Sequence, residues 1–164
     1  MILLLACSTT GEVEFKAGDY QFSTTDMSDD CLDGALEALF MPQGRTTPQE
    51  FEFPVYVPSL DELPASYEVS LREPFVGMPV TVTEAPNGLQ FEGAVMDEVL
   101  INQSLYGDCV ATMTVDSKIW PESSKAGTGV AEIDISAWRG SEGRCPSPDA
   151  DPCLVTLELE LERL

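Results

Sequence analysis

Apolar and polar residues alternate along much of this chain, and the alternation is clearest near its C-terminal end. The apolar positions of that run are Cys153, Val155, Leu157, Leu159 and Leu161. Glutamates occupy the intervening positions 158, 160 and 162. Because successive side chains of a strand point to opposite faces, this pattern predicts a strand with one buried face and one face in water.

Several other segments show the same alternation, namely 51–57, 69–71, 80–82, 109–116 and 131–137, and a further strand is expected at 18–22. Pro54 predicts an edge strand or a bulge, because proline cannot donate a ladder hydrogen bond. The pair Asn87 and Gly88 predicts a type I′ hairpin turn between strands near 78–84 and 89–96, since both residues tolerate a positive φ.

One segment carries a helical spacing instead. Its apolar residues are Leu32, Ala35, Leu36, Leu39 and Phe40. Ser28 is the expected N-cap, and Asp29 and Asp30 follow it where the helix dipole favours negative charge. Pro42 ends the segment. We therefore expect one short helix near 28–40, with its apolar stripe packed on the sheet.

Together these elements predict an all-β fold. We expect about eight antiparallel strands and the one short helix, either closed as a barrel or folded as a two-sheet sandwich. A length of 164 residues suits one domain with a real core. We place that domain at 18–164.

The N-terminal residues Leu4-Leu5-Ala6-Cys7 resemble the lipobox of bacterial lipoproteins. The resemblance implies that a signal peptidase cuts before Cys7 and that this cysteine carries acyl chains. Residues 1–6 are then the remnant of a signal peptide, and 7–17 are the lipidated cysteine and its polar tether. The alternative for 1–6 is an apolar N-terminal strand. Because Ser8 rather than aspartate follows the cysteine, the resemblance implies the outer membrane of the bacterial cell envelope.

The cysteine count agrees with an exported protein. The chain has 5 cysteines, and lipidation of Cys7 leaves the other 4, Cys31, Cys109, Cys145 and Cys153, for two disulfides. Three connectivities are open. We favour Cys145–Cys153, because the short, proline-rich loop between them biases its ends to meet, and this choice leaves Cys31–Cys109. Free thiols are the alternative. A metal site is less favoured, since the chain has no CxxC pair and no histidine.

The charge of the chain bears on its partners. The 29 acidic residues exceed the 8 basic ones and give a net charge of −21, spread along the sequence rather than gathered in a tail. An acidic surface repels polyanions, which excludes nucleic acid as a partner. It is typical of a protein kept soluble in a salty medium.

The residue types limit the available chemistry. Without histidine, the chain can form no Ser–His–Asp or Cys–His catalytic arrangement and no histidine-based zinc hydrolase site. We find no Gly-rich phosphate loop and no Gly-x-Ser-x-Gly elbow. A carboxylate pair of the glycoside hydrolase type remains, but the glutamates at 158–162 fall on a predicted wet face. We therefore expect no catalytic residue, no metal and no cofactor, and a protein that is not an enzyme.

Two tryptophans offer a candidate binding surface. Trp120 and Trp138 fall on the outer face by the alternation of their strands. An exposed aromatic pair is typical of a recognition surface. The alternative is that each tryptophan covers a loop or a barrel end.

Two function classes follow. The first is a non-catalytic envelope lipoprotein that acts as a binding or structural module, held to the membrane through its N-terminal lipid and facing a protein partner. The second rests on Gly18-Asp19-Tyr20, which resembles the start of a lipocalin-type barrel; this resemblance implies a carrier of a small apolar ligand. A carboxylate-based glycoside hydrolase is a remote third.

Overall fold

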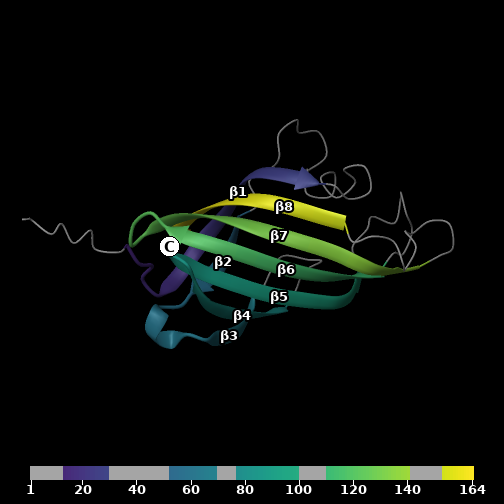
Figure 1. Ribbon diagram of the computed structural model, residues 1–164, viewed down its shortest axis with the longest axis horizontal. Coiled ribbons are helices and arrows are strands. Elements are labelled where there is room, and N and C mark those ends of the chain that lie inside the picture. The colour runs from purple at the N-terminus through teal and green to yellow at the C-terminus, as the bar shows by residue number, and fades with distance from the viewer. Residues whose placement is uncertain (1–12, 30–51, 70–76, 100–109, 141–152) are drawn as a thin grey trace, which may run out of the picture.

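The computed structural model describes residues 13–29, 52–69, 77–99, 110–140 and 153–164. These residues form eight strands and one short 3₁₀ turn (Figure 1). The strands are β1 (Gly18–Asp29), β2 (Glu52–Val57), β3 (Ala65–Val69), β4 (Met78–Ala85), β5 (Gly88–Val99), β6 (Val110–Pro121), β7 (Ala126–Arg139) and β8 (Cys153–Arg163). The 3₁₀ turn η2 (Leu60–Glu62) joins β2 to β3.

The eight described strands make one antiparallel sheet in the order β2-β1-β8-β7-β6-β5-β4-β3. The last strand pairs back onto the first, so that the yellow β8 lies beside the purple β1 in Figure 1. The sheet is therefore a nearly closed, barrel-shaped one, as the all-β prediction allowed. In the part of the chain that is described, no ladder joins β2 to β3, and these two edge strands form the seam of the barrel.

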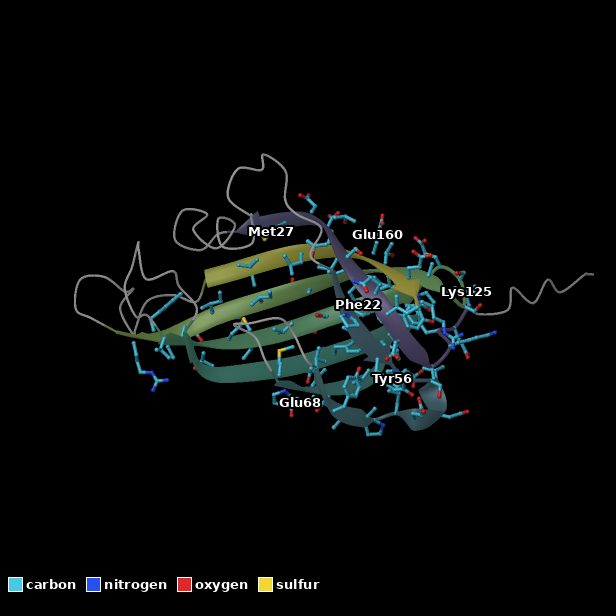
Figure 2. The ribbon with its side chains drawn as sticks, turned by 180° about the vertical axis from the view of Figure 1, so that it is seen from behind. Phe22, Met27, Tyr56, Glu68, Lys125 and Glu160 are labelled. Carbon is cyan, nitrogen blue, oxygen red and sulfur yellow. The ribbon has the colours of Figure 1, made fainter. Side chains whose placement is uncertain are left out.

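The predicted alternation places side chains correctly in β8. Val155, Leu159 and Leu161 are buried, whereas the glutamates 158, 160 and 162 are exposed. Glu160 lies on the outer surface of the barrel (Figure 2). The prediction for Pro54 is also confirmed, because β2 is an edge strand and this proline is exposed on it.

The β4–β5 hairpin is present, but its turn differs from the prediction. Ala85 pairs with Gly88, so the two turn residues are Pro86 and Asn87 rather than Asn87 and Gly88. Asn87 has a φ of 61°. A type I′ turn needs a positive φ at both central residues, which the proline ring forbids. Proline followed by a residue with positive φ is the combination of a type II turn.

The predicted start of the helix is wrong. Ser28 lies in β1 and pairs with Thr156 of β8, so it is not an N-cap. Asp29 pairs with Val155 in the same ladder. Pairing with a buried neighbouring strand outweighs the local capping signal here, as tertiary contacts often outweigh propensity. The rest of the predicted helix, residues 30–40, lies outside the described residues.

The connections between strands that the structure describes all lie at one end of the barrel. The turn at 58–64, the hairpin turn at 86–87 and the hairpin loop at 122–125 all lie at one end, which we call the closed end. Residues 13–17 and Leu164 lie there too (Figure 1).

Across the described ranges, no helix has the length and apolar character needed to span a membrane.

Candidate functional site

The inside of the barrel is crossed by two aromatic rings. Phe22 on β1 and Phe91 on β5 have ring centroids 6.2 Å apart at an interplanar angle of 73°. Three strands separate β1 from β5 in the sheet on the β8 side, so the contact runs through the interior. Such an edge-to-face pair is a favourable arrangement. We call Phe22 and Phe91 the aromatic floor, because they divide the interior in two.

Below the floor, the closed end is filled by side chains. The rings of Phe15 and Tyr20 meet edge to face, with centroids 5.6 Å apart. The Tyr20 hydroxyl lies within hydrogen-bond distance of the backbone carbonyls of Lys16 (3.0 Å) and Ser124 (3.1 Å). Burial raises the pKa of Tyr20, so the phenol stays protonated at neutral pH and can donate.

Two further contacts hold the closed end together. A Cβ at Gly127 would lie 2.7 Å from Cζ of Phe15, so only glycine lets this ring sit against β7. The Arg163 guanidinium donates from Nη2 to the carbonyl of Ala17 at 3.1 Å. The closed end is thus packed with aromatic rings and hydrogen-bonded to the chain ahead of β1.

Above the floor, the described interior is lined differently. Three methionines pack there, the half-buried Met27 on β1 and the buried Met78 on β4 and Met113 on β6, beside other buried residues that include Ile135, Trp138 and Val155. Figure 2 shows Phe22 part-way along β1 and Met27 near the strand end that lies away from Lys125 and the closed end. We call the interior around Met27, Met78 and Met113 the methionine section.

One methionine covers a glycine. A Cβ at Gly93 would lie 3.0 Å from Sδ of Met78. Methionine has three rotatable bonds and a polarisable sulfur, and its side chain adapts easily to a changed neighbour. A movement of Met78 therefore exposes bare backbone on the inner wall of β5.

Thr24 carries the one buried side-chain polar atom, among the described residues, that has no hydrogen-bond partner. It is 5% exposed and follows Phe22 as the next inward residue of β1. The ladder to β8 shifts register just after it, between Thr24 and Asp26. Burying a hydroxyl without a partner costs about 1–3 kcal/mol. An uncompensated polar atom in an apolar interior points to a missing partner.

The interior holds little else that is polar. Of the described buried residues, only Thr24 and Ser117 are polar, and neither is charged. This lining offers van der Waals contacts and hydroxyl hydrogen bonds. Apart from the Tyr20 phenol at the closed end, no described buried residue carries a titratable side chain for acid–base work.

The two tryptophans that were predicted to lie at the surface differ in their exposure. Trp120 is 36% exposed on the outer face of β6, as expected. Trp138 is 1% exposed and belongs to the core, so its predicted outer position is wrong. Thr112 pairs with Ser136 and Val110 with Arg139, so Ala137 and Trp138 together oppose Ala111. This β-bulge, with a φ of 52° at Ala137, reverses the alternation and turns Trp138 inward.

The predicted cysteine sites are largely outside the described part of the chain. Cys153 begins β8, with its backbone opposite Ile135 of β7. Cys7, Cys31, Cys109 and Cys145 lie outside the described residues. Lipidation at Cys7 and the disulfides therefore stay predictions.

The seam holds a polar cluster that the sequence reasoning missed. The backbone N–H of Ser59 donates to Oε2 of Glu62 at 2.8 Å, and the Tyr56 hydroxyl donates to the same carboxylate at 3.2 Å. The Ser59 hydrogen bond lowers the pKa of Glu62. Burial, and then the contact with Glu62, raise the pKa of Tyr56, and burial raises that of Tyr67. The Ser-x-x-Glu capping-box spacing at 59–62 was the available signal.

Carboxylates line up on the outer surface. Glu92, Asp116 and Glu132 stand opposite one another on β5, β6 and β7. Gln90 donates from Nε2 to Glu92 at 2.9 Å and to Asp116 at 3.1 Å, which eases the repulsion between them. Within the described ranges, no group of three or more acidic or cysteine side chains could hold a metal ion.

Comparison with protein family models, with curated proteins and with solved structures gives no match for this chain.

Proposed function

We propose that this protein is a non-catalytic carrier that holds a small apolar ligand inside its barrel, above the aromatic floor. The observation that carries the proposal is the asymmetry of the interior. The closed end is filled by Phe15 and Tyr20. The other side of the floor also holds buried residues such as Trp138 and Ile135, but it is the side where three methionines gather and where Met78 covers a glycine.

The size of the barrel supports this proposal. The interior of an eight-stranded barrel is just wide enough to be filled by side chains or to hold one small ligand. The methionine section is the part whose side chains can move aside at least cost, because methionine repacks readily. A ligand there would replace methionine contacts with contacts of its own apolar surface.

Lipid anchoring at Cys7 is the second part of the proposal. It rests on the lipobox resemblance of Leu4-Leu5-Ala6-Cys7. More than one acyl chain is needed for stable membrane attachment, and processed lipoproteins of this type carry more than one. A carrier held at the envelope surface would exchange apolar molecules close to a membrane.

The alternative classes have less support in the described residues. A protein-binding module would keep one exposed tryptophan, Trp120, because Trp138 is buried. A glycoside hydrolase would need two facing carboxyl groups. The glutamates of β8 are exposed and face solvent instead.

Ligand binding is tested with a neutral fluorescent probe, N-phenyl-1-naphthylamine, after native mass spectrometry of the freshly purified protein. We expect co-purifying apolar mass and saturable probe fluorescence from the delipidated protein. Met113→Trp fills the methionine section from β6 and should abolish probe binding. Thr114→Trp, the exposed neighbour on the same strand, is the matched control and should bind normally.

The outcome is read together with circular dichroism, which shows whether each variant folds. Normal probe binding by a folded Met113→Trp protein would place the ligand elsewhere and contradict the proposal. The absence of saturable binding to the parent protein would do the same.

Anchoring is tested separately by detergent-phase partition of the protein expressed with a full signal peptide in a bacterial host. We expect the parent protein in the detergent phase and Cys7→Ala in the aqueous phase. A Cys7→Ala protein that still partitions into detergent would refute lipidation at this residue.

A further inference from the structure

The interior of the barrel also bears on the chemical class of the ligand, if the proposed carrier function holds. Thr24 and the aromatic floor are neighbours on β1, and Thr24 Oγ1 has no partner. We propose that the ligand is an uncharged amphiphile, such as a long-chain alcohol, whose single polar oxygen hydrogen-bonds to the Thr24 hydroxyl.

The position of Thr24 sets the orientation of such a ligand. The inward residues of β1 run Tyr20, Phe22, Thr24 and then Met27 after the register shift. Thr24 therefore lies between the floor and the methionine section. A polar oxygen at Thr24 rests just above the floor, and the apolar chain extends past Met27 along the methionine section, away from the closed end.

The hydroxyl of threonine can both donate and accept a hydrogen bond. It can pair with an alcohol in either direction and with a carbonyl as donor. This versatility suits an uncharged oxygen. A ligand without any polar atom would leave the desolvation cost of Thr24 unrelieved.

Charge argues against an ionised fatty acid. No described lysine or arginine is among the buried residues of the interior. Arg163, the last residue of β8, donates a hydrogen bond to the carbonyl of Ala17 at the closed end, on the other side of the floor. A carboxylate without a cation in an apolar interior is strongly disfavoured. The net charge of −21 also repels an approaching anion.

The test is displacement of N-phenyl-1-naphthylamine by three ligands of equal chain length: dodecanol, dodecanoate and dodecane. At neutral pH we expect dodecanol to bind at least about tenfold more tightly than dodecanoate and dodecane. Thr24→Val removes the hydroxyl at nearly constant shape and should weaken dodecanol about tenfold, the scale of one buried hydrogen bond. Dodecane should bind the variant as tightly as it binds the parent.

Two further variants serve as controls for the loss of the Thr24 hydroxyl. Thr24→Ser retains the hydroxyl and should restore the preference for dodecanol. Thr114→Val makes the same replacement on the exposed face of β6 and should change nothing.

The inference is wrong if dodecanoate binds as tightly as dodecanol, or if Thr24→Val weakens dodecanol and dodecane equally. It is also wrong if the probe binds but none of the three ligands displaces it. Failure of the probe itself to bind is a different result, because it refutes the carrier function and the inference falls with it.

Discussion

The Tyr67 hydroxyl, on β3, donates a hydrogen bond to the backbone carbonyl of Tyr56, on β2. The two rings meet edge to face with their centroids 5.9 Å apart. These strands are the two edges of the described sheet, and no backbone ladder of the described residues joins them. A side chain thus bridges the seam where the backbone does not, and it occupies a carbonyl that an edge strand would otherwise leave open.

Replacement of Tyr67 by phenylalanine should destabilise the protein by about 1 kcal/mol, because it removes the hydrogen bond across the seam and keeps the ring. Tyr56→Phe is the matched control. Its hydroxyl contacts Glu62 on the exposed side, so its removal should have a clearly smaller effect. Urea unfolding measures both. Equal effects would mean that the Tyr67 hydroxyl contributes nothing special to the seam.

Glu62 should give the stability a component that depends on acid pH. The Ser59 N–H holds its pKa below the ordinary value of 4.5, so the folded state favours the carboxylate. The stabilisation is complete above pH 4.5 and is lost as the pH falls through the lowered pKa of the folded state. Glu62→Gln should remove this component. Thermal unfolding from neutral to acid pH checks it, and parallel curves for the two proteins would contradict it.

Substitution of Trp138 should destabilise the protein much more than substitution of Trp120. Trp138→Ala should cost about 3–5 kcal/mol, because it leaves a large cavity in the core. Trp120→Ala should cost about 1 kcal/mol or less, since the residue lies at the surface. Fluorescence gives an independent reading. The emission of Trp120→Phe, which reports Trp138, should be blue-shifted and protected from acrylamide, and that of Trp138→Phe should not.

Ala137→Gly should stabilise the protein by about 0.5–1 kcal/mol, because glycine adopts a positive φ without the steric cost that alanine bears. Ala94→Gly, in the extended part of β5, is the control and should destabilise by about 0.5–1 kcal/mol. Chemical denaturation measures both changes. A loss of stability in Ala137→Gly would mean that the bulge is not strained.

Thr24→Val should stabilise the ligand-free protein by about 1 kcal/mol or more, because it removes a buried hydroxyl that has no partner. Unfolding of delipidated protein measures the change. The same variant is expected to bind dodecanol less well, so stability and binding should move in opposite directions. A destabilised Thr24→Val protein would mean that its hydroxyl has a partner in solution.

Parts of the candidate site could be read from the sequence, and parts could not. Tyr20 and Phe22 alternate with polar residues, and one further step of that alternation reaches Thr24, which is buried as the pattern requires. Nothing in the local sequence showed that Thr24 would lack a partner. That property depends on which atoms β1 meets inside the barrel.

The contact between Phe22 and Phe91 could not be predicted from the sequence either. Alternation marks both residues as apolar and strand-bound, but it does not say which strands face each other across the interior. Only the order of the strands and the closure of the sheet bring β1 and β5 together. The helical start expected at Ser28 failed for a related reason, since that segment gains more by pairing with β8 than by capping a short helix.

The sequence by itself determined the all-β class and the inward or outward direction of most strand residues, because a side-chain period of two is a local property of the backbone. Pro54 limited its strand to an edge or a bulge, and the strand order decided for the edge. The tertiary structure alone decided that the strands close into a barrel with its seam at Tyr56 and Tyr67. It also decided that Trp138 is buried, because a bulge at Ala137 arises only when two residues of β7 face one residue of β6. The local alternation of apolar and polar residues determines which face of the sheet a side chain points to. The pairing between strands determines where a bulge reverses that alternation.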